Sequence, residues 1–164
     1  MTSATRRGHT LAETMLVLAL SAVGLTLALP QLVAPLRRAR VDATADALRA
    51  ALQLARTAAL ARGSPVRVCA SADGRRCAGG WEQGWIVLPQ PPSPALLVQR
   101  APERVTLRAT HALVDGVRFT AEGWARLDDG MLQFGHFTVC DGADGRTVVL
   151  APGGRVRVQP WRCA

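Results

Sequence analysis

The sequence predicts an α+β protein with one long N-terminal helix, packed in its second half on a C-terminal antiparallel β-sheet or sandwich. Three observations lead to this prediction. Residues 14–33 contain no charged side chain. Residues 41–59 place apolar side chains at spacings of three and four, the period of an amphipathic helix. Beyond residue 65, short alternating runs are separated by glycine and proline turns, which is typical of antiparallel sheets.

Residues 14–33 are long enough for a membrane helix. About twenty residues of helix rise roughly 30 Å, which is the thickness of the hydrocarbon core of a bilayer. Glu13 precedes the run, and a carboxylate costs on the order of 2–4 kcal/mol inside lipid unless a cation neutralises it. The nearest candidate cation is the amine that cleavage after Gly8 would expose. We therefore predict a transmembrane helix over residues 9–35, preceded by the short basic segment 1–8.

A secretory signal peptide is the alternative interpretation of this N-terminus. Such a peptide also has a basic start and an apolar region, and Arg6 and Arg7 fit a twin-arginine signal. However, the apolar run exceeds the usual length of about 7–15 residues, and Glu13 stands at its start. We therefore favour an anchor that the mature protein keeps.

The helix is expected to continue beyond the anchor as an amphipathic segment over residues 36–63. Ala, Leu and Arg dominate this stretch and are good helix formers. Gly63 can take the left-handed cap conformation and Pro65 prevents continuation, so the helix should end there. Pro30 and Pro35 are expected to kink or loosen the preceding part. The predicted buried stripe consists of Val41, Ala45, Leu48, Leu52, Ala55 and Ala59.

Residues 64–164 are predicted to form the β-rich domain. Turn signals occur at residues 122–123 and 128–130, and Asp144-Gly145 is a hairpin signal. The prolines between residues 89 and 94 predict a stiff loop that cannot join a ladder. The predicted strands cover residues 66–69, 85–88, 95–100, 105–109, 117–120, 131–140, 147–150 and 155–159.

The sequence carries no pattern of catalytic or cofactor-binding residues. It lacks a Gly-x-Ser-x-Gly nucleophile turn, a phosphate-binding glycine-rich loop and a His-Glu-x-x-His metal motif. His111 and His136 have no paired nucleophile, and a zinc site made from His136 and Cys140 would have too few ligands. We therefore expect no enzymatic activity, no metal and no cofactor. The aromatic side chains expected in the core or half-buried are Trp81, Trp85, Trp124 and Phe134.

The chain is strongly basic. Its formal net charge is +8, and all of its 20 basic residues are arginines. The guanidinium group binds phosphates and carboxylates in a bidentate manner, which the Lys ammonium cannot do. A GC-rich genome also yields many arginines, so only a local cluster of them is informative. The 164 residues suffice for one modest domain in addition to the anchor.

The four cysteines indicate disulfides, because an even number in a small exported domain is typical of such bridges. We predict the pairs Cys69–Cys77 and Cys140–Cys163. The first pair would close the loop that carries Arg75 and Arg76, and the second would tie the C-terminal tail to the preceding strand. Four cysteines allow three pairings, so the other two remain open.

The tail contains a candidate nucleic-acid site. On a strand, Arg155 and Arg157 would point to one face, about 6.6 Å apart, while Val156 and Val158 point to the core. Two guanidiniums in a row resemble the spacing of successive phosphates along one strand. Trp161 could stack on an unpaired base. The alternative is an exposed strand whose arginines are merely solvated. The arginines expected to flank the pair are Arg146 and Arg162.

The N-terminal order Gly8, His9, Thr10, Leu11, Ala12, Glu13, followed by the apolar run, resembles that of type IV pilins and type II secretion pseudopilins. The usual Phe is replaced by His9 and the usual Ile or Val by Ala12. The resemblance implies a prepilin peptidase that cleaves after Gly8 and methylates the new N-terminus at His9. It implies that Glu13 pairs with the N-terminal amine of a neighbouring subunit during assembly. It also implies an inner-membrane protein with a periplasmic domain, which assembles with other major and minor pilins on an inner-membrane platform.

The whole chain is similar to the FimT/GspH group of minor pilins. The shared features are the cysteine loop, Trp81-x-x-Gly84-Trp85, a late cysteine, and Gly154-Arg-x-Arg before a final cysteine. In the FimT-like branch the Gly-Arg-x-Arg element implies DNA binding during natural transformation, through Arg155 and Arg157. The GspH-like alternative implies a minor pseudopilin in type II protein secretion that does not bind DNA. A generic membrane-anchored adaptor is the third interpretation.

Overall fold

The structure is a computed structural model that describes residues 11–91 and 93–163, without the side chains of residues 22–32. Gly8 and His9, where cleavage and methylation are predicted, lie outside the described residues. Helix α1 (Leu11–Arg62) has 52 residues and continues without interruption through Pro30 and Pro35. The chain divides between Leu36 and Arg37 into two compact units, and α1 contributes to both.

The first unit contains the N-terminal part of α1. Glu13 lies in the first turn of the helix. The hydroxyl of Thr14 donates a hydrogen bond to the carbonyl of Leu11 (2.8 Å), and that of Ser21 donates to the carbonyl of Val17 (2.7 Å). These polar side chains therefore find partners on their own helix. Within the described residues, no helix combines the length and the apolar character that a membrane span requires.

In the second unit, α1 buries the predicted stripe. All six predicted positions, from Val41 to Ala59, are at most 1% exposed. Gly63 ends the helix with a φ of +60°, and the amide of Ser64 donates to the carbonyl of Ala59 (3.3 Å). The predicted helix end is therefore confirmed, because glycine adopts this left-handed conformation without strain.

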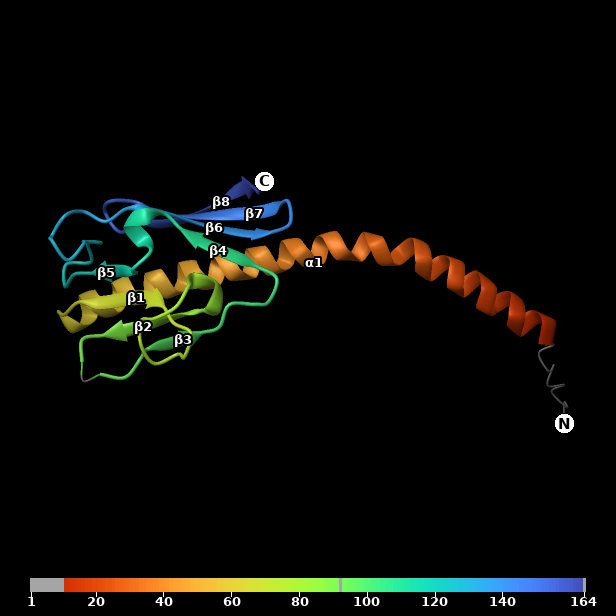
Figure 1. Cartoon of the computed structure of the whole chain (residues 1–164), viewed down its shortest axis with the longest axis horizontal. Helices are drawn as coiled ribbons and strands as arrows, with labels where there is room; N and C mark the ends of the chain where they lie inside the picture. The colour runs from red at the N-terminus through yellow and green to blue at the C-terminus, as the bar shows by residue number, and fades with distance from the viewer. Residues whose placement is uncertain (1–10, 92, 164) are drawn as a thin grey trace, which may run out of the picture. The chain divides into compact units, whose positions relative to one another are not determined.

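Two antiparallel four-stranded sheets accompany this helix. The first has the order β3-β2-β1-β5, and the second has the order β4-β6-β7-β8. In Figure 1, β2 and β3 lie on one side of the helix and β6, β7 and β8 on the other. The strands are β1 (Val66–Ala70), β2 (Trp85–Pro89), β3 (Leu97–Gln99), β4 (Thr106–Ala109), β5 (Val117–Phe119), β6 (Gly135–Asp141), β7 (Asp144–Leu150) and β8 (Val156–Arg162), with short 3-10 turns η1 (Trp81–Gln83) and η2 (His111–Leu113).

One hydrophobic core joins the helix to both sheets. Trp85, Phe119 and Phe137 are its largest fully buried side chains. Trp81 packs edge-on against Phe137, with the ring centroids 4.7 Å apart. The α+β fold predicted from the sequence is therefore confirmed, with two sheets that share one core.

Two predicted aromatic positions and one strand start are wrong. Strand β6 begins at Gly135 rather than at residue 131, because residues 131–133 instead pair with residues 125–127 across a local turn. Phe134 is 57% exposed and Trp124 is 46% exposed, so neither belongs to the core. Phe134 lies in the irregular segment before β6, where strand alternation does not apply.

The β6–β7 hairpin turns at Gly142 and Ala143, not at Asp144-Gly145 as predicted. Asp141 pairs with Asp144 across a two-residue loop, and Gly142 has a φ of +64°. Gly145 lies inside β7, where a Cβ atom would collide with the Sγ of Cys163. Its lack of a side chain therefore serves packing rather than the turn.

Pro89 also departs from its predicted place in a loop, because it is the last residue of β2 and pairs with Val66 of β1. Strand β3 pairs only with Trp85–Val87, so β2 has a neighbour on one side alone at this position. A proline has no amide hydrogen to donate, and it is tolerated there because β2 has no hydrogen-bonded neighbour on one of its two sides at this position.

Candidate nucleic-acid interface

Strand β8 places its side chains alternately on the two faces of the second sheet. Val156 and Val158 are partly buried against the core, while Arg155 and Arg157 are exposed. Successive side chains of a strand point to opposite faces, so Arg157 and Trp161 share the face that points away from the helix, and Arg155 directly precedes the strand. The predicted orientation of the two arginines agrees with this placement. We call this side of sheet β4-β6-β7-β8 the outer face.

The register of the sheet identifies the other members of the outer face. Arg157 of β8 lies beside Val149 of β7, which lies beside His136 of β6. On β4, Leu107 is buried in the core, so its neighbour Arg108 points outward beside Thr138. The strand positions on the outer face are Thr106, Arg108, His136, Thr138, Cys140, Gly145, Thr147, Val149, Arg157, Gln159 and Trp161.

A depression of about 430 Å³ lies on the outer face. Arg104, Arg108 and Trp161 line it together with the threonines of β4 and β6 and the Cys140–Cys163 bridge. Trp161 is 51% exposed, so one part of its indole is open to a ligand. Because guanidinium groups and an accessible indole meet here, the depression can accept a flat, anionic group such as a nucleotide.

The outward strand positions of the second sheet carry no carboxylate. The nearest acidic residues of the β6–β7 hairpin point to the helix instead. Asp141 accepts hydrogen bonds from Nε and Nη2 of Arg40 (2.9 and 2.7 Å), and Asp144 accepts one from Nε of Arg38 (3.1 Å). The charges of Arg108 and Arg157 are therefore not offset by a carboxylate at these strand positions, which favours an anionic ligand.

Arg146 and Arg162 do not lie on the outer face beside Arg157 but fall on the opposite side of the sheet. Arg146 lies beside Pro160 and, by the alternation of β7, shares the helix side with Val148. Its Nε is 2.8 Å from Oδ1 of Asp42 on α1. Arg162 pairs with Asp144 and falls on the same side. For Arg162 the sequence could have indicated this, because it lies four residues after Val158, and residues an even number apart on a strand point to the same face.

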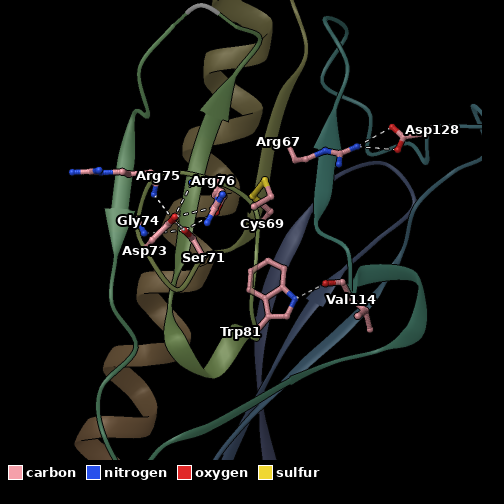
Figure 2. Close-up of a disulfide and its surroundings, with 11 residues drawn as sticks. Arg67, Cys69, Ser71, Asp73, Gly74, Arg75, Arg76, Trp81, Val114 and Asp128 are labelled. Carbon is pink, nitrogen blue, oxygen red and sulfur yellow. Dashed lines mark hydrogen bonds and ion pairs between the residues drawn. A yellow bond between two sulfur atoms is a disulfide. The ribbon is translucent and has the colours of Figure 1, made fainter.

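The disulfides have the predicted pairing. Cys140 is bonded to Cys163, with Cα atoms 6.1 Å apart, and this bridge lies on the outer face beside Trp161. It ties the tail that follows β8 to the middle of the sheet. Cys69 is bonded to Cys77, with Cα atoms 5.4 Å apart, on the first sheet (Figure 2).

The structure adds two arginines that the sequence analysis missed, Arg104 and Arg108. Arg108 could have been found, because it alternates with the buried Leu107 in the predicted strand over residues 105–109. Arg104 lies in a loop, where no periodicity applies, and only the fold brings it to Trp161. Across the described chain, no group of three potential metal ligands comes together.

Comparison with protein families relates the chain to a known group. The model of the family described as Type II transport protein GspH matches residues 44–154. This region contains the amphipathic part of the helix and most of the β-rich domain. It ends just before Arg155, so the match does not extend to the arginine pair. No curated protein matches the chain.

Solved structures with the same fold include the type IV minor pilin FimU of Pseudomonas aeruginosa PAO1 in two crystal forms. The P21 form has a TM-score of 0.59 and 22% identity, and the match covers 75% of this chain and 90% of FimU. The P65 form has a TM-score of 0.55 and 20% identity, with coverage of 73% and 92%. At this level of identity the likeness establishes the fold, which is that of a minor pilin.

Proposed function

Because the chain belongs to the GspH family of type II transport proteins, we propose that it is a minor pilin-like subunit that binds DNA during natural transformation. The binding site is the outer face, with Arg155 and Arg157 as its principal phosphate contacts. Arg104 and Arg108 extend the positive surface across the sheet, and Trp161 stacks on an unpaired base. The observation that carries the proposal is the row of guanidiniums on a face whose strands bear no carboxylate.

Phosphate contacts explain the expected lack of sequence preference. Arg157 and Trp161 lie four residues apart on β8, about 13 Å along it, and Arg155 directly precedes the strand, so these side chains form one row. It can follow a phosphate backbone over several nucleotides. Among the described residues of the β-rich domain, residues 64–91 and 93–163, no α-helix is present that could enter a major groove, and contacts to phosphates carry no base information. DNA binding is therefore expected to depend on salt and not on sequence.

Fluorescence anisotropy with the full chain in detergent and a labelled duplex of arbitrary sequence tests this proposal. The doubly substituted Arg155→Gln, Arg157→Gln protein should bind more weakly. Its log–log dependence of affinity on salt should be flatter by about 1.8, because each phosphate contact contributes about 0.9. A single-stranded probe should lose additional affinity when Trp161→Ala removes the stacking surface.

A control with the same loss of charge distinguishes binding at the proposed site from an effect of the net charge of the protein. Arg49 and Arg62 lie on exposed parts of α1, and replacing both with Gln removes the same two charges. This control protein should retain the affinity and the salt slope of the unaltered chain. Equal losses in the two double variants would show that DNA senses only the net charge, and the proposed site would be wrong.

The GspH family description favours a second candidate function, that of a minor pseudopilin in type II protein secretion. Both functions use the same fold, and the family match omits the arginine pair that distinguishes them. A strain that lacks the gene should lose DNA uptake if the first function holds. Loss of protein secretion with intact transformation would favour the second.

We also propose that the N-terminus works as in pilins. The prepilin peptidase cleaves after Gly8, His9 becomes the methylated N-terminus, and the uncharged run anchors the protein in the inner membrane with a periplasmic domain. Glu13 then pairs with the N-terminal amine of a neighbouring pilin during assembly on the inner-membrane platform. Mass spectrometry of the mature N-terminus and filament incorporation of Glu13→Gln test these steps. A mature start far beyond His9, or undiminished incorporation of the variant, would contradict them.

A further inference from the structure

A second cationic site lies on the other sheet, beside the Cys69–Cys77 bridge. The loop between these cysteines covers the face of sheet β3-β2-β1-β5 that points away from the helix, and Ile86 beneath it is fully buried. Next to the loop is a groove of about 490 Å³, a size typical of ligand sites. Its apolar surface comes from Leu88, Pro89 and Pro91. The four arginines that line the groove are Arg67, Arg75, Arg76 and Arg118.

The strand register places two of these arginines side by side. Arg67 of β1 pairs with Arg118 of β5, so both point outward from neighbouring strands. Like charges at directly opposed positions destabilise a sheet unless an anion lies between them. The structure shows such an anion: Nη2 of Arg67 donates to both carboxylate oxygens of Asp128 (2.9 Å each), and Nη1 of Arg118 is 3.7 Å from the same group.

Asp128 shows that the pair Arg67 and Arg118 can bind a carboxylate. Its side chain is 75% exposed and comes from a surface turn, so a carboxylate of a ligand can take its place on the two arginines. Figure 2 shows Arg67 reaching to Asp128 on one side of the disulfide and Arg75 extending away on the other. Within the described chain, the guanidinium of Arg75 makes no hydrogen bond or ion pair. It is therefore available to a ligand.

The loop that carries Arg75 and Arg76 is held in one conformation. The carboxylate of Asp73 accepts hydrogen bonds from the amides of Arg75 (2.8 Å) and Arg76 (3.1 Å). The hydroxyl of Ser71 donates to the carbonyl of Arg76 (2.7 Å) and accepts from the amide of Gly74 (3.0 Å). Together with the disulfide, these bonds position the loop before any ligand arrives, which reduces the entropic cost of binding.

We propose that this groove binds an extended acidic segment of another protein, with carboxylates on the arginines and aliphatic side chains on the apolar surface. Guanidinium groups match carboxylates in geometry and charge. Three observations favour this ligand over the alternatives. The groove has no aromatic lining residue on which a base could stack. A second copy of this chain is disfavoured, because each copy carries a net charge of +8. The mixed apolar and cationic lining suits a peptide better than a bare phosphate backbone.

The proposal is independent of DNA binding on the outer face, since the two sites share no residue. Its test uses the full chain in detergent and a fluorescein-labelled peptide that alternates Glu and Leu. Anisotropy should show binding that weakens by tenfold or more in the Arg67→Gln, Arg118→Gln protein, because the peptide loses two charge-assisted contacts. A peptide that alternates Lys and Leu should not bind.

Two further variants keep the test informative if that protein unfolds. Arg75→Gln alters an exposed side chain and should lower peptide affinity without changing the melting temperature. Asp128→Asn removes the internal competitor and should raise peptide affinity by about threefold or more. Unchanged affinity in both variants would overturn the proposal. The Arg155→Gln, Arg157→Gln protein should bind the peptide with unchanged affinity. Loss of both DNA and peptide binding in this protein would show that the groove is not a separate site. Loss of DNA binding but not of peptide binding in the groove variants would also show that the groove assignment is wrong.

Discussion

Arg104 combines a strained backbone with a place in the proposed DNA site. Its φ of +71° lies in the left-handed region, which costs a residue with a Cβ atom about 1–2 kcal/mol. Such strain tends to persist where the side chain has a function. We therefore predict that Arg104→Gly separates stability from binding. Thermal unfolding should occur at the same or a higher temperature, while DNA affinity falls; loss of stability with unchanged affinity would contradict this role.

The carboxylate of Asp73 gives the disulfide loop a dependence on pH. Hydrogen bonds from the amide of Arg75, and then from that of Arg76, lower the pKa of Asp73 below its ordinary value of 3.8. A lowered pKa means that the ionised group stabilises the fold. This stabilisation is complete above about pH 5 and is lost as the pH falls through the folded-state pKa.

The corresponding measurement follows the amide resonances of Arg75 and Arg76 between about pH 5 and pH 2. Both should titrate together, with a midpoint below 3.8. Asp73→Asn retains an oxygen acceptor but cannot ionise in this range, so its two amides should not respond. A midpoint above the ordinary value in the unaltered chain would show that these hydrogen bonds do not hold the loop.

At the scale of elements, the helix stripe determines the stability of the β-rich unit. Leu52 is fully buried between the helix and the sheets, whereas Leu54, on the same helix, is 39% exposed. Leu52→Ala should lower the free energy of unfolding by about 2–5 kcal/mol, because it leaves a cavity in a packed core. Leu54→Ala should cost less than about 1 kcal/mol.

Urea unfolding of the full chain in detergent, followed by tryptophan fluorescence, measures both changes. Trp85 is fully buried and packs in the same core, so its emission reports loss of this packing. Similar losses in the two variants would indicate that the helix is held by general hydrophobicity rather than by the stripe.

The same elements show which features were predictable from sequence. The stripe and its glycine end follow from local rules, because period and cap geometry depend on neighbouring residues. The position of the β6–β7 turn did not follow from local rules. Asp144-Gly145 has the sequence of a turn, but Gly145 in fact leaves room for the disulfide sulfur of Cys163. Phe134 was misplaced because the residues before it pair with residues 125–127 across a local turn and do not extend β6. A long-range contact in the first case, and a turn that the sequence did not indicate in the second, therefore decided these points.

The candidate site was predictable only in part, for the same reason. Arg155 and Arg157 share a face by simple alternation along one strand. Arg146 lies outside this face because its side chain is on the side of β7 that faces the helix, where it pairs with Asp42. The sequence pattern alone did not reveal this pairing. Arg104, and the pairing of Arg67 with Arg118, required the three-dimensional arrangement of separate strands.

For the molecule as a whole, eight of the 20 arginines lie on the outer sides of the two sheets. The outer face carries four of them without a carboxylate at its strand positions, whereas arginines of the groove pair with Asp73 and Asp128. The first arrangement suits a long polyanion, and the second suits short segments that can replace an existing carboxylate. Part of the basic charge is thus placed on two surfaces that differ in the chemistry of their ligands.

This division predicts that DNA and an acidic peptide bind the chain at the same time. The sites share no residue and face outward from different sheets, so neither ligand should displace the other by contact. The remaining coupling is electrostatic, and at about 0.15 M salt the screening length is about 8 Å. Saturating DNA should therefore weaken peptide binding by no more than about twofold at this salt concentration, and by more at lower salt. Two-colour anisotropy with both probes measures the effect directly. Complete displacement of the peptide by DNA at physiological salt would show that one surface binds both anions, and the assignment of separate ligands to the two sheets would be wrong.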